Sequence, residues 1–280
     1  MLRVTMTKSC FLLTLLLYVF CWPVFAAEPG AGETVAQNDN FPLPPTAVYS
    51  LMAGRAEKGD VGAMLSLGRL YEHGHGVARN YSKALEWYSK AAGQGLPEGY
   101  YNLGVCYEVG MGTASDMAKA GAAYAKAAEL GLPVAIHKMA GMYLKGAGVP
   151  QNSATAMRLL IRAADLGLPQ ACYDLGQVYM QGVYAQKQDY AAALEYFSKG
   201  AERGSLQSMA SMAAYFDDGT PVRRNYVKAL KWYLILKEYG VQGESLSSRI
   251  SALETKMGQI QIGNARSEAA EWLKEFPPRQ

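Results

Sequence analysis

The sequence is poor in the residues that usually carry enzyme chemistry or hold metals. Its 280 residues include only four cysteines and three histidines. It contains no G-x-S-x-G elbow, no phosphate-cradling glycine loop and no H-E-x-x-H pair. We therefore expect no catalytic residues, no metal site and no cofactor. Basic runs are also missing, and 27 Lys and Arg stand against 24 Asp and Glu, so we expect no nucleic-acid partner.

Long apolar runs are missing after the N-terminus. The one such run, Phe11–Phe20, follows Arg3 and Lys8 and precedes Val24-Phe25-Ala26, a suitable cleavage site. The run is too short for a comfortable membrane span. We therefore predict a signal peptide over residues 1–26, a periplasmic or secreted bacterial protein, and no stable membrane insertion after cleavage. An uncleaved N-terminal anchor is the alternative.

What the sequence has instead is a repeat. A Leu-Gly pair or a close substitute recurs at steps of 36, 36, 36 and 37 residues, at Leu67-Gly68, Leu103-Gly104, Met139-Ala140, Leu175-Gly176 and Met212-Ala213. Glycines keep the same phase at Gly59, Gly95, Gly131, Gly167, Gly204 and Gly240. A fixed period of this length marks a stacked repeat architecture. Such proteins usually present a surface to a partner and do not enclose a reaction.

Each repeat is predicted to be a pair of helices. In the first repeat, Leu67 and Tyr71 share one helical face, and Gly68 lacks a side chain where another helix must come close. Gly74 suits the left-handed end of this helix, and Asn80 is a good N-cap for the second helix. The equivalents of Asn80 in the later repeats are Asp116, Asn152, Asp189 and Asn225.

The repeats do not cover the whole chain. Residues 27–45 are rich in Gly, Pro, Asn, Asp and Gln, which predicts a flexible leader. Residues 46–240 hold about five 36-residue repeats preceded by a half-repeat helix. Residues 241–280 are predicted to form capping helices with a different outer face. The fourth repeat has one extra residue in its loop, Val183–Asp189, which could protrude.

These signatures resemble one protein family. A first helix with A-x-x-x-L-G-x-x-Y, a loop with G-x-G-V-x-x-N-Y and a second helix with K-A-L-E-W-Y-x-K-A-A-x-x-G are similar to the Sel-one-like repeat (SLR) family, a relative of tetratricopeptide repeats. The resemblance implies an all-α, right-handed α/α superhelical solenoid of antiparallel helix pairs. It also implies a non-enzymatic scaffold that binds a protein or peptide of unknown identity, in envelope assembly, signalling regulation or virulence.

The resemblance leaves a second function open. Resemblance to a cysteine-rich secreted branch of the family would imply a penicillin-binding or β-lactamase-like hydrolase. Proteins of that branch have a disulfide in each repeat, and this sequence lacks those cysteine pairs. Here Cys10 and Cys21 leave with the signal peptide. Cys106 and Cys172 occupy different positions in separate repeats, so we expect them to be unpaired and to act as small core residues. A reactive thiol is the alternative.

The candidate partner site is the first helix of each repeat. In tetratricopeptide arrays these helices line the concave side, and the predicted contact residues on that side are Leu65, Arg69, Glu72, Tyr101, Glu108, His137, Tyr173 and Gln177. Tyr101, His137 and Tyr173 form a central file over three successive helices. Half-buried aromatic residues with a polar tip are good interface anchors. The alternative is that the file only completes the packing between repeats.

Two polar pairs at the turns are predicted to be solvated. His73 and His75 flank Gly74 in the first loop. Asp217-Asp218 occupies the matching turn of the fifth repeat. Neither pair has the neighbouring Cys or His residues that a metal site requires.

Overall fold

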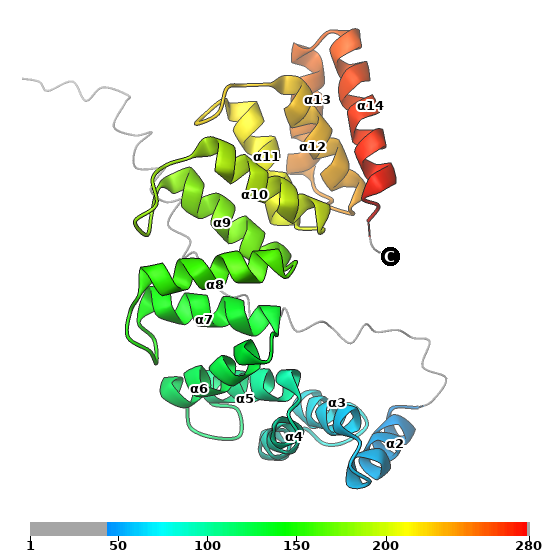
Figure 1. Ribbon diagram of the computed structural model, residues 1–280. Coiled ribbons are helices and arrows are strands. Elements are labelled where there is room, and N and C mark those ends of the chain that lie inside the picture. The colour runs from blue at the N-terminus through cyan, green and yellow to red at the C-terminus, as the bar shows by residue number, and fades with distance from the viewer. Residues whose placement is uncertain (1–43, 279–280) are drawn as a thin grey trace, which may run out of the picture. The chain divides into compact units, whose positions relative to one another are not determined.

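The computed structural model describes residues 44–278. The predicted signal peptide and nearly all of the predicted leader lie outside the described residues. Within the described range the chain forms thirteen helices and no strand, so the all-α prediction is confirmed there (Figure 1). The helices are α2 (Pro45–Glu57), α3 (Val61–His73), α4 (Tyr81–Gly93), α5 (Pro97–Val109), α6 (Met117–Glu129), α7 (Pro133–Lys145), α8 (Ser153–Asp165), α9 (Pro169–Gln181), α10 (Tyr190–Glu202), α11 (Leu206–Asp218), α12 (Tyr226–Glu238), α13 (Glu244–Lys256) and α14 (Gln259–Glu275).

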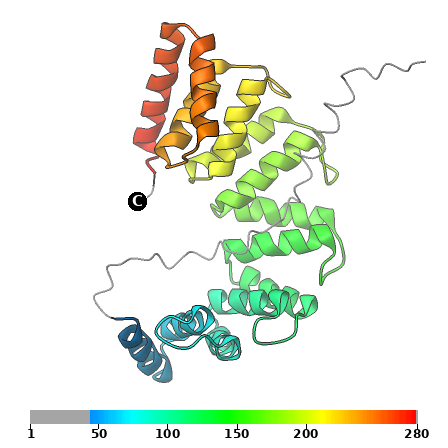
Figure 2. The same ribbon diagram turned by 180° about the vertical axis from the view of Figure 1, so that it is seen from behind.

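The helices alternate between two roles. We call α3, α5, α7, α9 and α11 the A helices and α4, α6, α8, α10 and α12 the B helices. Each A helix packs against the B helix that follows it, and the B helices α4, α6, α8 and α10 each pack against the A helix of the next repeat. Figures 1 and 2 show these pairs succeeding one another from α3 to α12. This serial packing is the predicted solenoid of antiparallel helix pairs.

The B helices begin where a side chain satisfies backbone amides that have no partner within the helix. Asn80, Asn152 and Asn225 each accept a hydrogen bond from the amide three residues later, at 3.0, 2.9 and 3.0 Å. Asp116 and Asp189 each accept from two amides. The predicted N-caps are therefore confirmed in all five repeats. Three A helices begin instead with a proline, whose missing N–H costs nothing at that position: Pro97, Pro133 and Pro169.

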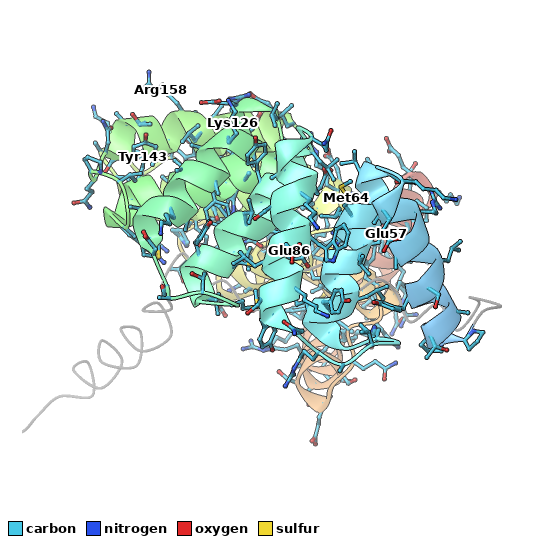
Figure 3. The ribbon with its side chains drawn as sticks, turned by 90° about the horizontal axis from the view of Figure 1, so that it is seen from below. Glu57, Met64, Glu86, Lys126, Tyr143 and Arg158 are labelled. Carbon is cyan, nitrogen blue, oxygen red and sulfur yellow. The ribbon has the colours of Figure 1, made fainter. Side chains whose placement is uncertain are left out.

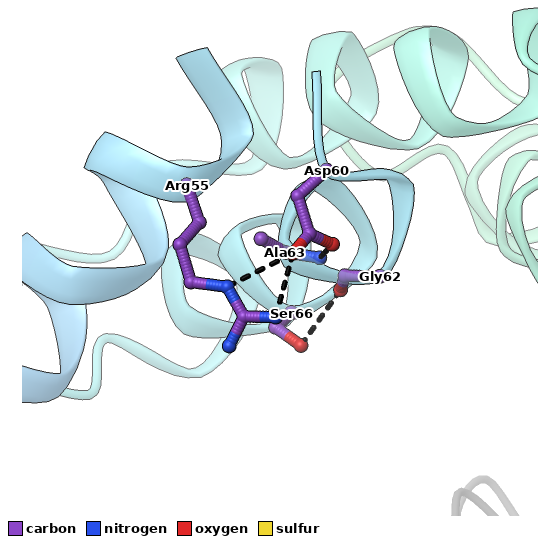
Figure 4. Close-up of polar contacts among 5 residues, drawn as sticks. All are labelled: Arg55, Asp60, Gly62, Ala63 and Ser66. Carbon is purple, nitrogen blue, oxygen red and sulfur yellow. Dashed lines mark hydrogen bonds and ion pairs between the residues drawn. The ribbon is translucent and has the colours of Figure 1, made fainter. Parts of the chain in front are cut away.

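The first A helix has a charged cap. Asp60 accepts a hydrogen bond from the Ala63 amide at 2.9 Å, and its second carboxylate oxygen lies 2.6 Å from Nη2 of Arg55 (Figure 4). The backbone hydrogen bond first, and the guanidinium second, hold the pKa of Asp60 below its usual value. Because Arg55 belongs to α2, the same carboxylate joins α2 to the first repeat.

A glycine in the middle of an A helix lets an aromatic ring reach the helix backbone. A Cβ atom added at Gly68 would lie 2.5 Å from the ring of Tyr88, far inside van der Waals contact. The equivalent pairs are Gly104–Tyr124 and Gly176–Phe197. All three rings are fully buried. The close approach predicted at Gly68 is confirmed, and the element that approaches is the B helix of the same repeat.

The outward sides of the B helices are charged. Glu86 on α4, Lys126 on α6 and Arg158 on α8 are exposed and labelled in Figure 3. The inward sides of the same helices carry alanines such as Ala91 and Ala127, which are completely buried. Small residues at these positions allow adjacent helices to pack closely, and this division between faces is the amphipathic pattern expected of a helix at the surface of a core.

The loops within the repeats follow one pattern with one variation. Gly74 ends α3 in the predicted left-handed conformation, with φ 73°. In the fourth repeat the extra residue is accommodated by Tyr184 and Ala185, which have φ 56° and 63° although neither is glycine. That loop still closes through a hydrogen bond of 2.9 Å from the Asp189 amide to the Tyr179 carbonyl.

Helices α13 and α14 both pack on α12. The ring of Trp272 on α14 stands edge-on to that of Trp232 on α12, with centroids 5.4 Å apart. Phe276 packs 5.0 Å from Trp272 on its other side, and its carbonyl accepts a hydrogen bond from Tyr239. These contacts cover the apolar surface that the last repeat would otherwise expose, which is what a terminal cap provides.

Candidate protein-binding surface

The predicted contact residues lie on four A helices. Three are on α3, two on α5, one on α7 and two on α9, and all of them are half-buried: Leu65, Arg69, Glu72, Tyr101, Glu108, His137, Tyr173 and Gln177. We call these eight residues the helix-A surface. Because none is sealed in the core and none is fully exposed, each combines a packed side with a side that faces outward.

The two tyrosines of the central file rest on core aromatic residues. The ring of Tyr101 lies 5.5 Å from that of Tyr124, and the ring of Tyr173 lies 6.0 Å from that of Phe197. Burial, and secondarily the charge of Glu108, raise the pKa of Tyr101. Its hydroxyl therefore stays protonated over the physiological range and remains a hydrogen-bond donor.

His137, between these tyrosines, is paired with a residue that the sequence analysis missed. Its Nε2 atom lies 2.6 Å from Oδ2 of Asp174, a residue that is only 1% exposed. The other carboxylate oxygen accepts a hydrogen bond from Gln170 at 2.9 Å. A buried carboxylate is tolerated only when such partners satisfy it. The pair links α7 to α9 across the helix-A surface.

The two glutamates of the surface accept hydrogen bonds from buried tyrosines. Tyr88 donates to Glu72 and Tyr124 donates to Glu108, each at 2.5 Å. The fifth repeat has the same arrangement, more loosely, between Tyr233 and Asp217 at 3.4 Å. The third and fourth repeats have apolar residues at both positions, Leu144 with Leu160 and Met180 with Phe197. This matched variation is a sequence signal that could have revealed the pairing.

Charged groups also connect one repeat to the next. Lys138 of α7 lies 3.2 Å from Glu108 of α5. Asp217 was predicted to face solvent, and that prediction is wrong, because the residue is only 9% exposed and lies 3.2 Å from Nη1 of Arg249 on α13. The repeat pattern could not reveal this contact, since α13 follows the last repeat.

The remaining members of the surface also have internal contacts. Gln177 donates to the Tyr173 hydroxyl at 3.0 Å and accepts from the Tyr215 hydroxyl at 3.4 Å. Leu65 packs against the core of the first repeat, and the charge of Arg69 acts on the Tyr88 hydroxyl. Each member of the helix-A surface is thus held by neighbours within its own repeat or the next one.

Helix α5 carries two buried polar atoms without a hydrogen-bond partner among the described residues. They are Oε2 of Glu98 and Nδ2 of Asn102. At the equivalent positions of α9, Gln170 and Asp174 bond to each other. An unpaired buried polar atom costs about 1–3 kcal/mol.

The other candidate groups lie apart from this surface. His73 and His75 are exposed, as predicted, with ring centroids 5.9 Å apart. Cys106 and Cys172 are both buried and unpaired. Burial raises the pKa of the Cys106 thiol to about 12. Residues 44–278 hold no group of three or more His, Cys, Asp or Glu suited to a metal ion.

Between residues 44 and 278, every helix is too short or too polar to cross a bilayer.

The fold and this surface define a class: an α/α repeat solenoid whose A helices carry half-buried polar and aromatic residues. The Sel1 repeat model matches the chain five times, over residues 61–96, 97–132, 133–168, 169–205 and 206–236. The chain therefore belongs to the Sel1 repeat family, as its motifs indicated. Sel1 repeats are protein-interaction modules, and Sel1 solenoids are generally non-catalytic scaffolds.

Solved structures show the same right-handed SLR solenoid. A Sel1 repeat protein from Oxalobacter formigenes is 28% identical, with TM-score 0.63, over 76% of this chain and 86% of that chain. The protein c5321, a protective antigen present in uropathogenic Escherichia coli strains, is 27% identical, with TM-score 0.62, over 81% of this chain and 56% of that one. This chain thus spans little more than half of c5321. No curated protein matches the chain.

Proposed function

We propose that this protein is a scaffold that binds a protein or peptide along the helix-A surface. The observation that carries the proposal is the central file, in which Tyr101, His137 and Tyr173 lie half-buried on three successive A helices. Each tyrosine has one face fixed by a core ring and so loses little conformational entropy on binding. Rigid aromatic residues of this kind are the usual energetic centres of protein interfaces.

The polar groups beside the file suit an extended backbone as ligand. The Tyr173 hydroxyl and the side-chain amide of Gln177 lie next to the file and bond to each other at 3.0 Å. A peptide presents one donor and one acceptor per residue. A partner segment laid across α5, α7 and α9 would therefore meet rings and hydrogen-bonding groups in turn.

Alanine at Tyr101 and Tyr173 tests this role. We expect the double variant to lose partners captured from the native envelope, with helicity and melting temperature nearly unchanged. The matched control is Tyr100→Ala with Tyr179→Ala, which removes two half-buried tyrosines from the same helices outside the file. If both double variants capture partners as the unmodified protein does, or if the first one melts far below it, the file belongs to the packing and the proposal fails.

We infer further that the protein acts without catalysis. The family's scaffold character supports this inference, as does the burial of both described cysteines. The purified full-length protein should not hydrolyse a reporter β-lactam above the background rate. Hydrolysis that a single substitution abolished, for example at His137, would favour the hydrolase interpretation instead.

Envelope or extracellular placement is part of the same proposal and depends on the predicted signal peptide. Protein recovered from the native cell should begin at Ala27, as measured by N-terminal sequencing. Recovery of a chain that begins at Met1 would contradict the predicted cleavage. A stable stoichiometric complex on purification would indicate a structural role in an envelope assembly rather than transient binding.

A further inference from the structure

A second surface feature lies where the loop of the fifth repeat meets the B helix before it. This pocket has a volume of about 460 Å³ and lies between α10, α11 and the start of α12, elements labelled in Figure 1. Its apolar floor consists of Leu194, Phe216 and Val222. Its rim carries three exposed cations, Arg223, Arg224 and Lys228. None of the six belongs to the helix-A surface.

The pocket occurs where the repeat pattern loses a packing glycine. In the first loop, Gly76 touches the Pro45 carbonyl so closely that an added Cβ atom would overlap it. The second and third loops have the same contacts, Gly112 with Tyr81 and Gly148 with Met117. The fifth loop has Pro221 at this position. A proline ring cannot make the same approach, and the fourth loop also lacks this glycine, with Tyr184 at the position.

Only the fifth repeat has cations at all three of these rim positions, because the first repeat has Ala78, Arg79 and Lys83 there and the second has Ala114, Ser115 and Lys119. The positions of Arg223, Arg224 and Lys228 are occupied by Pro150, Gln151 and Thr155 in the third repeat, and by Lys187, Gln188 and Ala192 in the fourth. No carboxylate within residues 44–278 forms an ion pair with any of the three. Several lysines elsewhere on the B helices are paired, such as Lys90 with Glu86, whereas Lys83 at the position equivalent to Lys228 forms no ion pair within the described residues. The positive end of the α12 dipole adds to the same field.

We infer that this pocket binds an acidic peptide segment that carries an apolar side chain between its carboxylates. The floor needs an apolar group to cover it, and the unpaired cations need carboxylates around that group. A small inorganic anion would meet the cations and leave the floor exposed to water, so the two features together favour a peptide. The site is independent of the helix-A surface.

The chain itself supplies substitutions that preserve the loop. In the third repeat, Gln151 donates to the Leu144 carbonyl at 2.8 Å, as Arg224 donates to the Asp218 carbonyl at 2.8 Å. Because Leu144 corresponds to Asp217, R224Q should anchor the loop to the Asp217 carbonyl while losing its charge. K228T likewise introduces the residue that the third repeat has at this position, Thr155. The matched control is R79Q with K83T, which removes the same two residue types from the equivalent positions of the first repeat.

The probe is a fluorescein-labelled peptide of sequence EEFEE, with binding to the full-length protein followed by fluorescence anisotropy. At about 0.1 M salt, charges farther than about 10 Å from the site are largely screened. We expect R224Q with K228T to bind about 2- to 30-fold more weakly, the range for two exposed ion pairs. The R79Q with K83T control should bind as the unmodified protein does. Circular dichroism should show both variants folded.

Two altered peptides test the two halves of the site. QQFQQ lacks the carboxylates and EEGEE lacks the apolar side chain, and both should bind more weakly than EEFEE. Three results would each overturn the inference. The first is that QQFQQ or EEGEE binds as tightly as EEFEE, and the second is that both double variants lose the same affinity. The third is that EEFEE does not bind at about 1 mM, an affinity near the lower limit of specific recognition. Displacement of EEFEE by inorganic phosphate at constant ionic strength would reassign the pocket to simple anions.

Discussion

Replacing Gly104 with alanine tests the packing of α5 on α6. The added methyl group would lie 2.5 Å from two ring carbons of Tyr124, which is completely buried. Overpacking of this kind costs about 1–3 kcal/mol, whereas alanine in place of a helical glycine gains about 1 kcal/mol. We therefore expect the free energy of unfolding to fall by up to about 2 kcal/mol. Urea denaturation followed by circular dichroism measures the change.

Gly54→Ala is the matched control for this substitution. Gly54 also lies inside a helix, and an added Cβ atom there would meet no neighbouring group within 4 Å. The two variants gain the same helix propensity, so Gly104→Ala should be the less favourable by about 1–3 kcal/mol. In a Tyr124→Leu background the penalty should disappear, because the third repeat has Ala140 and Leu160 at these positions. Equal effects at Gly54 and Gly104 would refute the reasoning.

Three further predictions concern capping and protonation. Asn152→Ala should lower the free energy of unfolding by about 1 kcal/mol, because the Thr155 amide loses its acceptor. Asn152→Asp should restore the lost stability. An alanine variant as stable as the parent would contradict the cap. Burial, and then the charge of Glu72, raise the pKa of Cys106 to about 12. The native thiol should therefore not react with a disulfide reagent near pH 8, but should react once urea unfolds the chain. Rapid labelling of the folded protein would show that Cys106 is not a buried core thiol. Burial also raises the pKa of Tyr215 and Tyr233 from 10.0 to about 12, so the folded state keeps these protons after the unfolded chain has lost them, and stability should fall as pH rises from 10 towards 12. A spectrophotometric titration in which all tyrosines ionise near pH 10 while the helices persist would disprove this.

Much of the local structure follows from short-range sequence signals that recur in several repeats. Asn80 and Asp116 cap their helices because a side-chain acceptor can reach backbone amides two or three residues away whatever the rest of the fold does. Glycine at the position of Gly68 accompanies an aromatic residue of the B helix in the first, second and fourth repeats, although the fifth combines Ala213 with Tyr233. The pairing of Glu72 with Tyr88 could also be predicted, because acidic and tyrosine residues vary together among the repeats.

The long-range polar contacts could not be predicted in the same way. His137 of α7 and Asp174 of α9 meet across two successive repeats, and no other repeat has that pair. Asp217 was expected to be solvated, yet Arg249 reaches it from α13. Each contact depends on the rotation of one helix against another, which is set by all the side chains between them.

The amino-acid sequence fixed the period, the helix pairs, the capping residues and the family, because each follows from contacts within one repeat and recurs along the chain. Folding then determined which polar groups meet across repeats and where the rings of the central file rest. It also determined that the fifth loop leaves a charged pocket. These features depend on distances between elements that are far apart in sequence, and such distances arise only when neighbouring repeats pack against each other.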